Sequence, residues 1–323
     1  MENRIWAVRA FINEEFDEGF WNELIEKAAS ERMNAILFCP NNFICYKSHP
    51  EIAAPTAFPR EWFTEQVRKC RDRGIELLPE INFSATHDDW MGEYSRMVST
   101  PTYYKVTKDL IEELYEVFES PTYIHLGMDE EGHKVQADRD YVCYRQGDLY
   151  MHDLRYFVNC VRALGATPWV WACPLFDMTE DFIKEFKPDE IVISPWYYNA
   201  FRREHWTPVE SRAEYVAYYN EGDYAKMNIR FVEEDPFLVN FRAKALPLMK
   251  KGYRYIPCAS VYNRCDYNTV ELMEYFREGG IDRQILGYVT SPWIPLNCNE
   301  TCTLFYEETF RFFREARKQI YGE

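Results

Sequence analysis

Eight short apolar runs, separated by longer amphipathic stretches, constrain the fold of this 323-residue sequence more than any other feature. The runs are rich in β-branched and aromatic residues with little alternation, as strands covered on both faces are. They lie at 5–11, 33–39, 75–81, 122–127, 167–173, 190–196, 255–261 and 285–291. Helical patterns occupy 18–32, 60–73, 103–119, 148–164, 179–186, 268–279 and 301–320. Eight strands alternating with helices predict an α/β fold, a single closed (β/α)8 or TIM barrel, rather than an open sheet.

The connection at about 197–250 is longer than the one helix that a βα unit needs. Its patterns predict a helix near 208–220, an extended piece at 228–235 and a second helix near 238–250. We interpret it as an elaborated connection between the sixth and seventh strands. No linker rich in Pro, Gly or Ser divides the chain, so we expect one barrel domain over 1–323.

Charge and cysteine content narrow the partners and the compartment. The chain has 37 Lys and Arg against 53 Asp and Glu, a formal net charge of −16, which disfavours binding to nucleic acid or to anionic membranes. No apolar run reaches the ~18 residues of a membrane helix, and the N-terminus has no secretory signal pattern. The ten Cys include no CxxC pair, so we expect reduced thiols in a cytoplasmic protein and no metal site of the usual zinc spacing.

Polar and aromatic residues gather at the C-terminal ends of the predicted strands, where barrel enzymes of this kind have their active sites. The densest group is HLGMDEE at 125–131, in which Asp129, Glu130 and Glu131 follow the fourth strand. Crowded carboxylates raise the pKa of at least one of them in an enclosed site, and glycoside cleavage uses two carboxyls in different protonation states. A solvated acidic loop or a helix N-cap is the alternative interpretation. The other strand-end candidates are Arg9, Asn41, Asn42, Glu80, Asn82, His87, Trp171, Asp177, Trp196, Tyr197, Tyr262, Asn263, Asp266 and Trp293.

The fourth strand resembles a family signature. TYIHLGMDEE is similar to the strand of glycoside hydrolase family 20, the β-N-acetylhexosaminidases, that ends His-(Ile/Leu)-Gly-x-Asp-Glu. His125, Gly127, Asp129 and Glu130 match it, and Met128 replaces the more usual second glycine.

The resemblance extends along most of the chain in the same order. RMNAILF (32–38), GIELLPEINFSATH (74–87), GATPWVWA (165–172), ASVYN (259–263) and GYVTSPW (287–293) resemble the second, third, fifth, seventh and eighth strands of that family. Two positions depart from the family pattern. The second strand ends in CPNN, where many members have an Asp, and His87 lies one residue later than the family spacing.

The resemblance implies a glycosidase that removes β-linked GlcNAc or GalNAc by substrate-assisted retaining catalysis, without metal or cofactor. It makes Glu130 the general acid and base, and it makes Asp129 the residue that orients the 2-acetamido group. The residues that it assigns to substrate binding are Arg9 for sugar hydroxyls, His87 behind the acid, Trp171, Trp196 and Trp293 as pocket walls, and Tyr262 for the acetamido oxygen.

Other interpretations stay open at this stage. The chain is alternatively a non-catalytic sugar-binding barrel, or a metal-dependent barrel enzyme acting on a free sugar, to which His133 and Glu131 point. Arg9 is alternatively a buried ion-pair partner of Glu80, and each Trp an ordinary core residue. The expected partner is a small-molecule or oligosaccharide substrate, whose linkage, gluco or galacto configuration, and exo or endo cleavage stay open, as does the oligomeric state.

Overall fold

All the strand pairs of the computed structural model are parallel. The structure describes residues 4–132, 136–137, 140–172, 175, 177–196, 198, 200–201, 230–231, 248–261, 268–280 and 282–323. The strands are β1 Ile5–Phe11, β2 Ala35–Cys39, β3 Glu76–Pro79, β4 Tyr123–His125, β5 Thr167–Trp171, β6 Val192–Ser194, β7 Ala200–Phe201, β8 Arg230–Phe231, β9 Arg254–Tyr255, β10 Cys258–Ala259 and β11 Gly287–Thr290. Each of the eight predicted runs contains at least one of them, and 255–261 divides between β9 and β10.

Two parallel sheets follow the chain order of the predicted strands. One has the order β10-β11-β1-β2-β3 and the other β4-β5-β6-β9. Isolated bridges join the two sheets on both sides: Glu80 after β3 pairs with His125 of β4, Trp196 after β6 pairs with Cys258 of β10, and Tyr255 of β9 pairs with Ile285 before β11. The fold is therefore an α/β fold with parallel sheets that isolated bridges connect on both sides.

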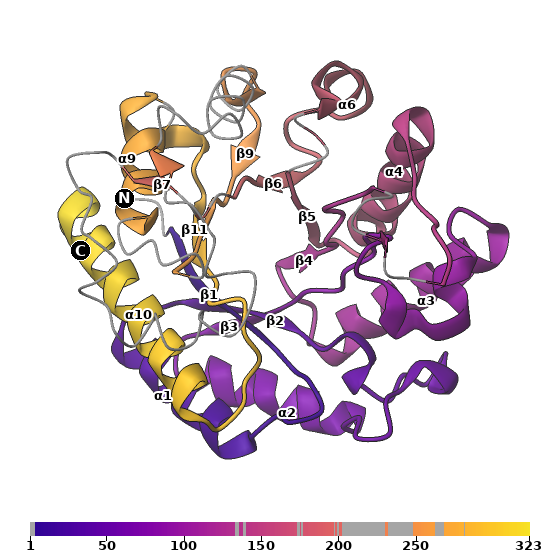
Figure 1. Cartoon of the computed structure of the whole chain (residues 1–323), viewed down its shortest axis with the longest axis horizontal. Helices are drawn as coiled ribbons and strands as arrows, with labels where there is room; N and C mark the ends of the chain where they lie inside the picture. The colour runs from indigo at the N-terminus through magenta and orange to yellow at the C-terminus, as the bar shows by residue number, and fades with distance from the viewer. Residues whose placement is uncertain are drawn as a thin grey trace.

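The helices lie around the outside of the strands (Figure 1). They are α1 Glu18–Ser30, α2 Arg60–Arg71, α3 Pro101–Val117, α4 Gly147–Ala163, α6 Thr179–Glu185, α9 Asn268–Glu278 and α10 Glu300–Tyr321, with short 3-10 helices at Asn41–Phe43, Pro50–Ile52, Asp89–Arg96 and Asp282–Gln284. All seven helical predictions are confirmed to within two residues at each end. Side chains of Asp17, Thr100 and Asn299 accept a hydrogen bond from the backbone N–H three residues on, which caps α1, α3 and α10.

Successive side chains of each strand pack into two different cores. In β1, Trp6 and Val8 belong to the outer core between strands and helices, whereas Ala7 belongs to an inner core. The inner core consists of Ala7, Ala35, Leu37, Leu78, Trp169, Trp171, Val192, Ile256, Cys258 and Val289. Because both faces are buried, the strands need apolar residues at every position, which explains the absence of alternation in the sequence.

Most of the elaborated connection lies outside the described residues, including the helix predicted near 208–220. Within it, β7 pairs in parallel with β8, so part of the extended piece predicted at 228–235 is a strand. The described cysteines, which exclude Cys173 and Cys265, are free thiols. No helix of the described residues is both long and apolar enough to cross a bilayer.

Candidate active site

The segment after β4 follows a path that few sequences can adopt. Gly127, Met128 and Glu130 have positive φ angles of 70°, 65° and 46°. A Cβ on Gly127 would lie 2.0 Å from Oδ1 of Asn82, so a side chain at position 127 would overlap the neighbouring segment. The hydroxyl of Tyr150, on α4, donates to the carbonyl of Met128 at 2.7 Å. These constraints hold Asp129 and Glu130 at the C-terminal end of the strand.

The segment after β3 runs alongside and is bonded to it at successive positions. Backbone N–H groups of Ile81 and Phe83 donate to the carbonyls of His125 and Leu126 at 2.8 and 3.1 Å. Farther on, the Ser84 hydroxyl donates to the carbonyl of Asp129. The sequence motif and the third-strand residues 82–87 are thus parts of one site.

The carboxylate of Asp129 is enclosed, with 12% of its side chain exposed. Its Oδ1 accepts a hydrogen bond from Nδ2 of Asn82 at 3.1 Å, and its Oδ2 lies 3.6 Å from Nε2 of His87. Burial raises the pKa of Asp129 above its ordinary value, although the charge of His87 and the Asn82 hydrogen bond oppose the rise. The expectation that crowding and enclosure raise the pKa of one carboxyl holds for Asp129.

Glu130 is the more exposed of the two, with 39% of its side chain accessible. Its Oε2 lies 3.1 Å from Nε2 of His87. That hydrogen bond holds the pKa of Glu130 below its usual value, against a smaller effect of burial. Burial lowers the pKa of His87, but the hydrogen bond to Glu130 and the charges of Asp129 and Glu130 outweigh it, so the pKa is raised. At pH values between the pKa of Glu130 and the pKa of His87, the two side chains are both charged and form an ion pair.

The third acid of the motif, Glu131, is held away from this pair. Its carboxylate accepts from the backbone N–H of Ala85 at 2.9 Å and of Arg145 at 3.2 Å, and it bonds the Arg145 guanidinium. The side chains of Glu131 and Arg145 are 3% and 0% exposed. Arg145 also donates to the carbonyl of Phe83 and lies 3.5 Å from Asp153 on α4. Glu131 thus anchors the segment. The sequence analysis missed Arg145, which lies outside every predicted element.

Arg9, on β1, forms a buried ion pair with Glu80, which follows β3. Its Nε and Nη2 donate to the two carboxylate oxygens of Glu80 at 2.5 and 3.1 Å, and the Glu80 side chain is fully buried. Its guanidinium also lies 4.5 Å from the ring centre of Trp293. The alternative that Arg9 pairs with Glu80 is therefore realised, and the guanidinium supports an aromatic ring beside the site.

The three predicted tryptophans belong to one aromatic cluster. Trp171 and Trp293 have ring centres 5.6 Å apart, Tyr198 lies 5.6 Å from Trp293, and Trp196 stacks on Tyr198 at 5.0 Å. His125, at the start of the motif, lies 4.3 Å from Trp171. The cluster therefore adjoins the acidic segment, and Tyr198 is a member that the sequence analysis missed. Tyr262 lies outside the described residues, as do Tyr197, Asn263, Asp266 and His133.

Among the described residues, the ligand atoms of His87, Asp129 and Glu130 lie within 4.8 Å of one another. That spacing is small enough for a shared ion. In the structure, Nε2 of His87 bonds the Glu130 carboxylate, so the group is a hydrogen-bonded pair beside a buried acid.

Comparison with solved structures identifies the fold class. The chain is similar to a family 20 exo-β-N-acetylglucosaminidase from Vibrio harveyi solved with N-acetylglucosamine, with a TM-score of 0.64, 14% identity, and coverage of 97% of this chain and 54% of that one. A β-N-acetylhexosaminidase from Bacteroides fragilis gives 0.63, 13%, 97% and 65%. A family 20 catalytic module of a pneumococcal exo-β-D-N-acetylglucosaminidase gives 0.60, 13%, 98% and 84%.

These likenesses confirm, at the level of the fold, the resemblance predicted from the sequence. The fold is that of the catalytic domains of glycoside hydrolase family 20. The chain spans between about half and two thirds of the first structures that it matches. The sequence itself matches no family model and no curated protein.

Proposed function

We propose that this protein is a glycoside hydrolase that removes β-linked N-acetylhexosamine by substrate-assisted retaining catalysis. The observation that supports it best is that Asp129 and Glu130 leave the tip of one strand into different environments, one enclosed and one open, in a fold shared with family 20 enzymes. We also propose that the two sheets form one closed (β/α)8 barrel and one domain, because bridges connect the sheets on both sides, at β3 and β4 and again where β6 and β9 meet β10 and β11.

In the proposed reaction, Glu130 donates a proton to the glycosidic oxygen while the 2-acetamido oxygen of the substrate attacks C1. The C1–O bond breaks, the leaving group keeps the proton, and a cyclic oxazolinium forms. Asp129 accepts the acetamido N–H and stabilises the positive charge that develops on it. Water then attacks C1, Glu130 takes its proton, and the acetamido group is restored with retention at C1.

The proton on Glu130 has to be supplied, because His87 lowers the pKa of Glu130 in the free protein. A bound sugar covers the 39% of the Glu130 side chain that water now reaches, and desolvation raises a carboxyl pKa. Desolvation by the bound sugar acts on kcat, whereas kcat/KM reports the free enzyme. We expect kcat/KM to rise as pH falls through the raised pKa of His87, where the Glu130–His87 pair gains the proton that Glu130 then donates, and to fall again once Asp129 is protonated.

The aromatic cluster supplies the apolar wall of the proposed pocket. Trp196 and Trp293 come from the end of β6 and the segment after β11, and the apolar face of a pyranose packs on such rings. Trp171 of β5 is 1% exposed and packs against Trp293 from the inner core, so it supports this wall from behind. Tyr262 remains our candidate for the hydrogen bond to the acetamido oxygen. His87 hydrogen-bonds the acid, Glu130. Arg9 packs on the ring of Trp293, so its proposed role is to hold that ring and not to contact sugar hydroxyls.

The test measures hydrolysis of the aryl β-glycosides of GlcNAc and GalNAc and of a disaccharide with an unactivated leaving group. Glu130→Gln should lower kcat/KM by about 10²–10⁴-fold, with the larger loss on the disaccharide, because its leaving group depends on the acid. Asp129→Asn should remove the preference for 2-acetamido over 2-hydroxy sugars. Glu119→Gln, at the opposite end of the strands, is the control and should keep the full rate. Full activity of Glu130→Gln would overturn the assignment of the acid.

Two other functions give different results in the same experiments. A sugar-binding barrel without catalysis binds a thiazoline mimic of the oxazolinium in calorimetry and hydrolyses no glycoside. A metal-dependent enzyme loses activity with chelator and contains metal on elemental analysis; the 4.8 Å spacing of His87, Asp129 and Glu130 is the one observation in its favour.

A further inference from the structure

We propose that Asn82 is a positioning residue for Asp129, which fixes the carboxylate through its side-chain amide and keeps it ionised without adding a charge. The inference rests on the proposed function of Asp129. It concerns a residue to which the family resemblance assigns no role. Three observations carry it: the orientation of the amide, the space that the amide occupies, and the charges around Asp129.

The orientation of the amide is determined by a second hydrogen bond. Oδ1 of Asn82 accepts from the backbone N–H of Ser84 at 2.9 Å, while Nδ2 donates to Oδ1 of Asp129 at 3.1 Å. An amide turned the other way would direct its NH2 group at the Ser84 N–H and its oxygen at a carboxylate oxygen. Both contacts would then be repulsive, so the NH2 group faces Asp129.

The amide occupies space that only a glycine partner leaves free. Asn82 is 6% exposed, and its Oδ1 lies 2.0 Å from the position that a Cβ on Gly127 would take. Its own carbonyl accepts a hydrogen bond from the Trp90 indole N–H at 3.1 Å. Both the backbone and the side chain of Asn82 are therefore fixed, and an Asp129 carboxylate bonded to it has one favoured orientation.

The charges near Asp129 explain why a neutral donor suits this position. Among the described residues, the titratable groups that face the carboxylate are His87, 3.6 Å away after β3, and the adjacent Glu130. The carboxylate of Glu131 accepts hydrogen bonds from the Arg145 guanidinium and from two backbone N–H groups, so it does not face Asp129. The Asn82 amide donates at every pH and stabilises the ionised form, whereas a carboxyl in its place would compete with Asp129 for one proton.

Asn82→Asp is the sharpest test, because aspartate keeps the acceptor for Ser84 and replaces only the donor. The acidic limb of the kcat/KM profile should move to higher pH by at least about one unit, because two carboxyls in contact cannot both ionise. Asn82→Ala removes the donor without adding a charge and should move the limb in the same direction by less. Asn22→Asp on α1 matches the charge change far from the site and should leave the profile unmoved.

A second readout separates this inference from the proposed function. Carbon-13 NMR titration of the Asp129 carboxyl, assigned with Asp129→Asn, reports its pKa whether or not the protein hydrolyses any glycoside. A raised pKa of Asp129 in Asn82→Asp and Asn82→Ala supports the positioning role even if the protein is inactive. Coincident titration curves in wild type and both variants, or a rate loss equal at every pH, would overturn it.

Discussion

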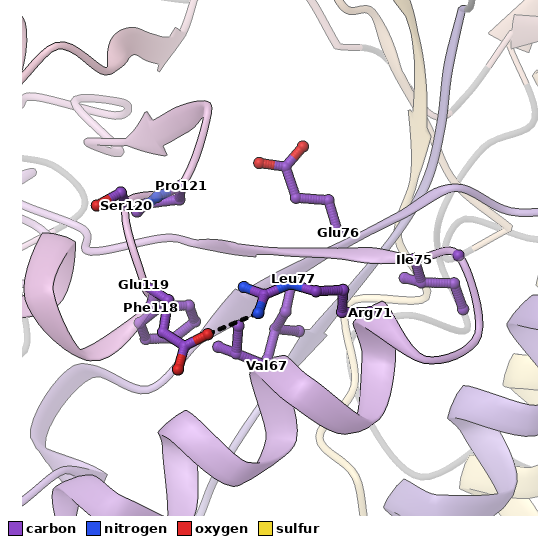
Figure 2. A pocket seen from close by; sticks show the side chains of 10 residues that line it. Val67, Arg71, Ile75, Glu76, Leu77, Phe118, Glu119, Ser120 and Pro121 are labelled. Atoms are coloured by element: carbon purple, nitrogen blue, oxygen red, sulfur yellow. Dashed lines mark hydrogen bonds and ion pairs between the residues drawn. The ribbon is translucent and has the colours of Figure 1, made fainter.

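The two ends of the strands carry charged side chains in opposite environments. At the C-terminal ends, Arg9 pairs with Glu80 and Arg145 with Glu131, and all four side chains are 8% exposed or less. At the N-terminal ends of β3 and β4, a hollow of about 280 Å³ lies between the ends of α2 and α3 (Figure 2). Its ion pair, Arg71 with Glu119 at 2.7 Å, has side chains that are 58% and 24% exposed.

The difference distinguishes the candidate site from a surface hollow. An exposed pair adds little stability, because water and salt screen it and two long side chains lose freedom. A buried pair costs desolvation, and an apolar pair of similar volume is often at least as stable. The two buried pairs at the end where Asp129 and Glu130 lie therefore favour that end as the candidate site. The hollow in Figure 2 is lined by apolar side chains and by charges that have partners, Arg71 with Glu119 and Glu76 with the backbone N–H of Thr122.

The largest expected effect is from Arg145→Met, at the C-terminal end. Removing the guanidinium leaves Glu131 buried without its counter-charge, which should lower the free energy of unfolding by roughly 3–5 kcal/mol. Denaturant unfolding measures the change. A double-mutant cycle with Glu131→Gln should recover part of the loss, since the second substitution removes the uncompensated charge. If the two single changes simply add, Arg145 does not act through Glu131.

Gly127→Ala should have the next largest effect, and Gly74→Ala is its matched control at the other end of the strands. Both glycines have φ near 70°, which costs a residue with a side chain ~1–2 kcal/mol. A Cβ at 74 has no neighbour within 4 Å, but a Cβ at 127 meets Asn82, which adds ~1–3 kcal/mol and displaces the amide from Asp129. Unfolding and kcat/KM are measured together. Equal losses of stability and activity in the two variants would contradict a steric conflict between residue 127 and Asn82.

Hydrophobic patterning predicted the elements well, because each strand and helix is defined by local periodicity. The strand at 5–11 and the helices at both ends of the chain coincide with the structure nearly residue for residue. The candidate acids also followed from sequence, since three carboxylates at the end of a predicted strand are a local feature. Hydrophobic patterning could not predict the hydrogen-bond partner of each acid, because the partners come from segments far apart in the chain.

The Glu131–Arg145 pair shows where that limit lies. Nothing in the residues around 145 has a helical or strand period, so the sequence offered no reason to place an arginine beside the motif. Crowding predicted that one carboxyl has a raised pKa, but burial decides which one, and burial depends on how the segments after β3 and β4 pack. The structure gives the raised pKa to Asp129 and the lowered pKa to Glu130.

A smaller effect tests the electrostatics of the His87–Glu130 pair through pH. The pKa of His87 is raised above its ordinary 6.5, so its contribution to stability is present below pH 6.5 and is lost as pH rises through the folded-state pKa. The pKa of Glu130 is lowered from 4.5, so its contribution is present above pH 4.5 and is lost as pH falls through the folded-state pKa. The stability difference between wild type and His87→Gln should therefore be largest between pH 4.5 and 6.5. A difference that is constant from pH 4 to 9 would contradict the ion pair.

The smallest expected effect is from Arg71→Met at the edge of the hollow in Figure 2. Arg68 also bonds Glu119, at 2.9 Å, so Glu119 keeps a partner when Arg71 is replaced, and solvent reaches both groups. The denaturant midpoint and the hydrolysis rate should both match the wild type within error, at low and at high salt. If Arg71→Met lowered the midpoint as far as Arg145→Met, exposure would not distinguish the two ends. The buried pairs would then indicate nothing special about the C-terminal one.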